Sequence, residues 1–178
     1  LWRTTSTLDG IELVTDLRPG TVTSHIASLT AVGSQSYFVA DNGLTGLELW
    51  TRDGTAAGTR LVREFAAGTT DSAVNQLTAH DGRLYFLDGD SALYCTDGTT
   101  TNALLSRLSA DVSGTLGIHA ISSLQSTPLG LFFRAEDTAA GTELWVTDGT
   151  PAGTRRLSDS NGGPAGSLIG SVASIATG

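Results

Sequence analysis

Hydrophobic positions recur along this chain at an almost constant interval. An aliphatic residue returns every 47 or 48 positions, at Leu29, Leu77, Leu124 and Val172. Another aliphatic residue stands three positions before each of these, and two adjacent aromatic residues follow the first three by eight positions. Repetition at a fixed period of about 20 to 50 residues is typical of proteins built from repeated structural units.

A second set of positions repeats in a register of its own. It begins with Leu-Trp or Leu-Tyr at Leu1, Leu49, Leu93 and Leu144, and an Asp-Gly-Thr triplet follows in all but the first copy. Two independent registers indicate one continuous array. We divide residues 1–178 into the end of one unit (1–20), three complete units (21–68, 69–112 and 113–160) and the start of another (161–178).

Each complete unit is expected to form four β-strands. In the unit 21–68 we predict them at 24–32, 36–41, 47–52 and 59–65, with turns rich in Gly, Asn and Asp between them. The second of these strands is apolar at four consecutive positions, 37–40. A strand with that pattern is buried on both of its faces.

These features predict an all-β protein, a β-propeller built from four-stranded antiparallel blades of about 48 residues. Each blade would bury both faces against its neighbours. A parallel β-helix has a much shorter repeat, and the periodicity of a helical solenoid is not found. The chain would hold an incomplete set of blades. Because apolar end faces make repeat proteins insoluble, we expect the rest of its own propeller, or other chains, to complete the ring.

The Asp-Gly-Thr triplets contain the most obvious candidate carboxylates. An aspartate that opens a turn commonly accepts hydrogen bonds from backbone amides two residues later, so its presence in successive repeats favours a structural role. The Gly or Asn three positions after each triplet predicts a left-handed backbone there. The predicted turn motif consists of Asp53, Gly54, Thr55 and Gly58; Asp97, Gly98, Thr99 and Asn102; and Asp148, Gly149, Thr150 and Gly153.

Aromatic residues recur at the second position of the Leu-Trp motif, as Trp2, Trp50, Tyr94 and Trp145. A large ring at one strand position of every repeat is expected to fill the same gap between neighbouring sheets. A ladder of rings that stacks on sugars is the alternative.

Two segments, 46–59 and 141–154, contain the motif most completely, as Glu-Leu-Trp-x-x-Asp-Gly-Thr-x-x-Gly-Thr. They resemble the bacterial ELWxxDGT repeat family, and residues 16–20 are similar to the linker usual in that family. The resemblance covers nearly the whole chain, with departures at Thr5-Ser6 in the first copy and at Tyr94 in the third. It implies large secreted or surface proteins, chiefly of gliding and predatory bacteria, and no established enzymatic activity.

Composition narrows the classes of partner. The 178 residues have a formal net charge of −8, from 10 Lys and Arg against 18 Asp and Glu. Binding to nucleic acid requires a basic surface that displaces counterions, so we expect no nucleic acid partner. No apolar run is long enough for a transmembrane helix, and we expect no membrane insertion. Cys95 is the single cysteine, which excludes a disulfide within the chain and a cysteine zinc site.

No cofactor, metal or catalytic residue is predicted. His25, His80 and His119 stand at different positions of their repeats and lack metal-ligand spacing. Calcium prefers oxygen ligands and stays an alternative at the acidic loops 41–42, 88–90 and 136–137. The sequence has no phosphate-binding glycine loop, nucleophile elbow or Cys–His pair.

The sequence thus predicts a non-enzymatic scaffold or binding module of a secreted or cell-surface protein, associated with the outer membrane in bacteria. Its partner would be a protein or a glycan, and a lectin is one form of this hypothesis. The alternative is a propeller enzyme, a glycan hydrolase or lyase, whose catalytic residues lie outside this segment.

Overall fold

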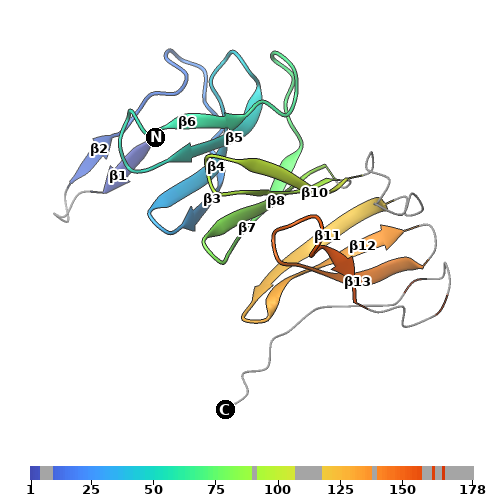
Figure 1. Ribbon diagram of the computed structural model, residues 1–178. Coiled ribbons are helices and arrows are strands. Elements are labelled where there is room, and N and C mark those ends of the chain that lie inside the picture. The colour runs from blue at the N-terminus through green and yellow to red at the C-terminus, as the bar shows by residue number, and fades with distance from the viewer. Residues whose placement is uncertain are drawn as a thin grey trace.

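The computed structural model describes residues 1–4, 10–89, 92–106, 118–137, 140–157, 162 and 166. These residues form four antiparallel β-sheets and no helix, and the strands of each sheet follow one another in chain order (Figure 1). The all-β prediction is confirmed, while the ring of a propeller stays a prediction.

A two-stranded N-terminal hairpin precedes three four-stranded sheets, which we call the first, second and third sheet. The hairpin consists of β1 (Trp2–Thr4) and β2 (Ile11–Leu13). The first sheet consists of β3 (Ala27–Val32), β4 (Gln35–Asp41), β5 (Leu47–Arg52) and β6 (Arg60–Arg63). The second consists of β7 (Val74–His80), β8 (Arg83–Asp88), β9 (Ala92–Thr96) and β10 (Thr101–Ser106). The third consists of β11 (Ile118–Thr127), β12 (Gly130–Asp137), β13 (Gly141–Thr147) and β14 (Arg155–Arg156).

The strands predicted for the first sheet lie close to those observed. β5 coincides with the prediction of 47–52, and β6 is shorter than the predicted 59–65. β3 begins at Ala27 rather than at 24, and the positive φ of 49° at His25 interrupts the extended backbone just before it. The further unit predicted at 161–178 lies almost wholly outside the described residues.

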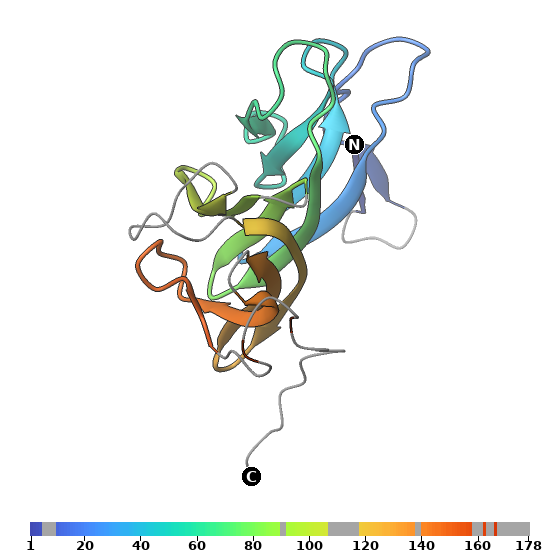
Figure 2. The same cartoon turned by 90° about the vertical axis from the view of Figure 1, so that its right-hand side faces the viewer.

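Successive sheets stack face to face (Figure 1 and Figure 2). In β4, Tyr37 and Val39 pack against the second sheet, whereas Phe38 and Ala40 pack toward the N-terminal hairpin. All four side chains are buried, and so are those of 84–87 in β8. The consecutive apolar positions of the sequence therefore correspond to strands covered on both faces, as predicted.

The first strands of the three sheets, β3, β7 and β11, lie beside one another and share an irregularity. Ser28, Gln76 and Ser123 have φ values of 56°, 51° and 59°, and the strand register shifts at each of them. Positive φ is uncommon outside glycine, so three equivalent cases indicate a β-bulge that the fold imposes. The amide of Leu124 donates to Gln76 Oε1 across 3.2 Å, which links the bulges of the second and third sheets.

Candidate functional site

Each Asp-Gly-Thr triplet forms the turn between the third and fourth strands of its sheet. Asp53 Oδ1 accepts hydrogen bonds from the hydroxyl of Thr55 at 2.7 Å and from its amide at 2.9 Å. Asp148 accepts the same two bonds from Thr150, again at 2.7 Å and 2.9 Å. Both donors favour the ionised carboxylate, and the hydroxyl has the larger effect. Together they hold the pKa of both aspartates below its usual range.

The corresponding aspartate of the second sheet has amide donors only. Asp97 Oδ1 accepts from Thr100 N at 2.7 Å and from Thr99 N at 2.8 Å, and these amides lower the pKa of its carboxyl. The expected bonds between each aspartate and its own turn are thus confirmed. All three carboxylates serve the turn that contains them.

The prediction of a left-handed backbone at Gly58, Asn102 and Gly153 is wrong, because none of the three has a positive φ. The positive φ belongs instead to the glycine inside the triplet, at 95° in Gly54, 89° in Gly98 and 89° in Gly149.

The later glycine of the motif is needed for a different reason. A Cβ on Gly58 would lie 2.0 Å from Asp53 Oδ1, and a Cβ on Gly153 would lie 2.0 Å from Asp148 Oδ1. The Gly58 amide also donates to Thr55 Oγ1 at 2.9 Å. The aspartate folds back over this glycine, and the close approach leaves no space for a side chain.

The turn of the second sheet is two residues shorter than the other two. Asn102 lies in β10 and pairs with Cys95. In the first sheet it is Arg60 that takes this position, opposite Thr51. Asn102 therefore corresponds to Arg60, and the gapless alignment that equated it with Gly58 is out of register by two residues.

The turns also join each sheet to the one before it. Arg60 of the first sheet donates from Nη2 to the carbonyl of Gly98 in the second, at 2.5 Å. Arg3 of the N-terminal hairpin donates to the carbonyl of Gly54 in the first sheet, at 3.0 Å. In both cases a guanidinium binds the glycine of the next Asp-Gly-Thr turn, which is a charge-assisted hydrogen bond.

Close packing accompanies these hydrogen bonds. A Cβ on Gly98 would lie 2.7 Å from the hydroxyl of Tyr37 in the preceding sheet, and one on Gly149 would lie 2.5 Å from that of Tyr85. Gly98 and Gly149 are thus fixed twice, by a positive φ and by a tyrosine of the preceding sheet. The Asp-Gly-Thr turn is an inter-sheet contact as well as a hairpin turn.

The repeat aromatics lie between sheets. Trp50 and Trp145 are 8% and 3% exposed, and Trp50 Nε1 donates to the carbonyl of Ala40 at 3.0 Å. Tyr94 packs into the cluster between the first and second sheets. Buried rings cannot stack on a sugar, so the ladder interpretation fails for Trp50 and Trp145. Trp2 differs, because it is 61% exposed.

The glutamate of the Glu-Leu-Trp motif is buried too. Glu48 has no exposed surface and accepts hydrogen bonds from the amides of Ala66 at 2.9 Å and Phe65 at 3.0 Å. Burial raises the pKa of its carboxyl, and the two amides oppose that effect. From β5, Glu48 thus holds two residues that follow β6, where the chain leaves the sheet.

The acidic loops use their carboxylates locally. Asp41 is ion-paired with Arg18, and Asp137 is paired with Arg156 at 3.0 Å. Among the described residues no group of three His, Cys, Asp or Glu side chains could hold a metal ion. Asp90 lies outside the described residues. His25 is exposed, and the side chain of His119 is not described.

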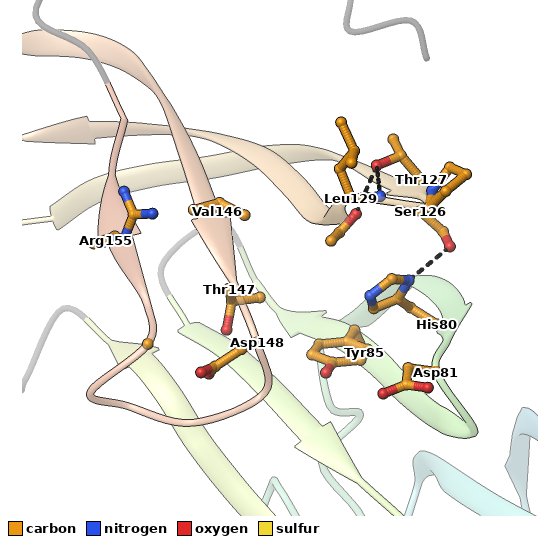
Figure 3. A pocket seen from close by; sticks show the side chains of 13 residues that line it. His80, Asp81, Tyr85, Ser126, Thr127, Leu129, Val146, Thr147, Asp148 and Arg155 are labelled. Carbon is orange, nitrogen blue, oxygen red and sulfur yellow. Dashed lines mark hydrogen bonds between the residues drawn. The ribbon is translucent and has the colours of Figure 1, made fainter. Parts of the chain in front are cut away.

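One histidine lies in a cleft. His80 Nδ1 is 3.0 Å from Ser126 Oγ, and this contact bridges the second and third sheets (Figure 3). The cleft has a volume of about 910 Å³ and opens at the edge of the joint between these sheets. It is lined by the β7–β8 turn, the β11–β12 turn and the Asp-Gly-Thr turn of the third sheet; its residues are His80, Asp81, Tyr85, Ser126, Thr127, Pro128, Leu129, Gly130, Val146, Thr147, Asp148, Gly153 and Arg155. We call it the joint cleft.

No protein-family model, curated protein or solved structure matches this chain. The joint cleft is therefore assessed by its own chemistry. It combines an imidazole, hydroxyl groups, the exposed carboxylate of Asp81 and the exposed guanidinium of Arg155 with the apolar side chain of Leu129, which is 85% exposed. Such a mixture of donors, acceptors and apolar surface suits ligand binding. The His80–Ser126 contact has no carboxylate hydrogen-bonded to the imidazole in the described structure, so the third member of a catalytic triad is missing there.

Sequence reasoning did not find this cleft. His80 is separated from Ser126 by 46 residues, and only the stacking of two sheets brings them together. Val32 stands at the position of His80 in the first sheet, so the histidine does not recur. That loss of repetition at a turn is the one signal that could have drawn attention to it.

In the described part of the chain no helix could cross a membrane.

Proposed function

We propose that this chain is a non-enzymatic binding module of the β-propeller type, part of a secreted or cell-surface protein, and that it holds a protein or glycan ligand in the joint cleft. The proposal rests on a difference between the residues that recur in the repeats and those that do not. The recurring residues form turns and pack between sheets; they are the triplet aspartates and glycines and the buried tryptophans. The cleft places polar groups that do not recur, such as His80 and Ser126, within reach of a ligand.

The chemistry of the cleft supports a ligand rich in hydroxyl or amide groups. Its polar side chains include donors and acceptors of both charge signs, and its rim is apolar at Leu129. Glycans and extended polypeptides both present many such groups. The resemblance of the repeats to the bacterial ELWxxDGT family supports the extracellular location.

A glycan array and an array of extended peptides, both probed with the intact chain, would test the proposal. Ligands found in either arm are then titrated against cleft variants and matched controls. His80→Ala is paired with His25→Ala, and Leu129→Ala with Leu44→Ala, because Leu44 is likewise exposed (75%) but lies outside the cleft. We expect the cleft variants to weaken binding about tenfold or more, which corresponds to about 1.4 kcal/mol, and the controls to bind as the wild type.

Three outcomes would overturn the proposal. They are the absence of binding in both arms, binding that the cleft variants leave unchanged, and conversion of the bound ligand into product. The last would favour the alternative of a propeller enzyme.

A further inference from the structure

Two hairpin turns form the rim of the joint cleft, and each holds one side chain toward solvent. Asp81 lies in the β7–β8 turn with a φ of 45°, a left-handed conformation that tight two-residue turns require. Leu129 lies in the β11–β12 turn. The hydroxyl of Thr127 fixes that turn, since it accepts from the amide of Leu129 at 3.2 Å and donates to the carbonyl of Gly130 at 3.0 Å. The carboxylate and the leucine are therefore presented from short, ordered turns.

The exposure of these turns does not depend on where the stack of sheets ends. The second sheet is covered on both faces, and Asp81 is nevertheless exposed. The corresponding turn of the first sheet, at 33–34, is exposed as well. Leu129 takes the same place in the third sheet and is 85% exposed. The turns between first and second strands thus lie at the rim of the stack, where a neighbouring sheet does not cover them.

Asp81 brings a negative charge to one side of the cleft. Among the described residues its carboxylate has no hydrogen-bond or ion-pair partner. The guanidinium of Arg83, in the same hairpin, lies against the third sheet instead, where its Nη1 is 3.0 Å from the position of a Cβ on Gly149. Arg155 lies at the opposite end of the cleft from Asp81 (Figure 3). The carboxylate of Asp81 is therefore available to a cation from outside the chain.

The first joint lacks this combination of side chains. Val32 and Ala79 take the places of His80 and Ser126 there, and both pack in an apolar cluster. The turn at 33–34 consists of Gly and Ser, without a charge or an apolar side chain. Of the two joints between the described four-stranded sheets, the second alone combines a polar bridge with a carboxylate and an exposed leucine.

We propose, on the basis of the binding function proposed above, that the joint cleft holds an extended peptide with a basic residue close to an aliphatic one. The basic side chain pairs with Asp81, and the aliphatic side chain packs on Leu129. The His80–Ser126 pair lies between the two turns (Figure 3) and offers polar groups to the peptide backbone. Polypeptides combine a permanent cation with an aliphatic side chain, whereas glycans supply mainly hydroxyl and acidic groups. The net charge of −8 also favours encounter with a basic partner.

Fluorescence anisotropy with labelled peptides in a Gly-Ser background tests this inference. The peptides carry Arg and Leu, adjacent or one residue apart, and each has a counterpart with Glu in place of Arg. The intact chain should bind the better Arg peptide at least about tenfold more tightly than its Glu counterpart, which is the scale of a hydrogen bond to a charged group. Asp81→Arg should reverse that preference. Leu129→Ser should weaken binding of the Arg peptide about tenfold, because apolar contact is lost.

Glu136→Arg is the matched control, since it makes the same change of charge at an exposed carboxylate outside the cleft and should keep the wild-type preference. If circular dichroism shows that Asp81→Arg is unfolded, Asp81→Asn replaces it, because Asn tolerates a left-handed backbone; the preference should then disappear.

Equal affinity of the wild type for the Arg and Glu peptides would sink the inference, and so would a preference that the Asp81 variants leave unchanged. If neither peptide binds but a glycan does, and His80→Ala weakens that binding, the inference is wrong and the proposed binding function stands. Absence of binding by every peptide and glycan would overturn both.

Discussion

Alanine in place of Gly98 tests whether the Asp-Gly-Thr turns hold neighbouring sheets together. Gly98 has a φ of 89°, and a Cβ there would lie 2.4 Å from Gln35 Oε1 and 2.7 Å from the hydroxyl of Tyr37. Gly54 has a similar φ of 95°, but nothing lies within 4 Å of its Cβ position. Gly54→Ala therefore measures backbone strain alone, and Gly98→Ala measures a similar strain together with the collision.

The two contributions can be estimated separately. A residue with a Cβ in a left-handed conformation costs about 1–2 kcal/mol, which is the loss of unfolding free energy expected for Gly54→Ala. At Gly98 the collision adds the cost of overpacking, about 1–3 kcal/mol. If the turn moves away instead, the bond from Arg60 is lost, at a cost of about 1.5–3 kcal/mol. By either route we expect Gly98→Ala to lose about 2–5 kcal/mol in total.

Urea-induced unfolding, followed by tryptophan fluorescence and circular dichroism, measures both variants on the same scale. Tyr37→Phe removes the hydroxyl that the new Cβ would meet, so it should restore part of the loss in the Gly98→Ala background. A double-mutant cycle with the single Tyr37→Phe variant isolates that coupling. Equal losses for Gly98→Ala and Gly54→Ala, within about 0.5 kcal/mol, would refute the idea that the turn contacts the preceding sheet closely.

Three further predictions concern the repeats. Gly58→Ala should lower the unfolding free energy by about 1–3 kcal/mol because its Cβ meets the Asp53 carboxylate. Asn102→Ala, at an exposed strand position, should change it by less than about 0.5 kcal/mol. If urea unfolding showed the larger loss for Asn102→Ala, the alignment that equates Asn102 with Gly58 would be supported instead. The triplet aspartates have lowered pKa values in the folded protein, so the stability they contribute is present above the unfolded pKa of about 3.9 and is lost as the pH falls through the lower folded values. Replacing all three by Asn should therefore make the unfolding free energy depend less on pH below about pH 4. An unchanged dependence would contradict the assignment of this pH effect to the three aspartates. Gln76→Ala removes the acceptor of the Leu124 amide and should cost about 0.5–1.5 kcal/mol; amide exchange at Leu124 that is no faster in the variant would argue against the bond.

The sequence by itself determined the all-β class and the approximate positions of the strands of the first sheet. Turn residues and consecutive apolar positions are local signals, and they placed β5 within its observed bounds and predicted burial on both faces of β4. The bonds between the triplet aspartates and their turns are local as well, because donor and acceptor lie two or three residues apart.

Only the three-dimensional structure decided which glycines need a positive φ. An Asp-Gly-Thr-x-x-Gly turn contains two glycines, and the sequence does not tell which one has a left-handed backbone and which one lacks space for a side chain. Gly98 is fixed by Tyr37 of another sheet, and Gly58 by the carboxylate of Asp53 above it. The joint cleft depends on the same kind of contact. His80 and Ser126 meet because two sheets stack, and a pairing across 46 residues leaves no periodic trace in a sequence whose repeats are otherwise alike. Repetition records what every unit shares, whereas packing between units decides where single residues come together.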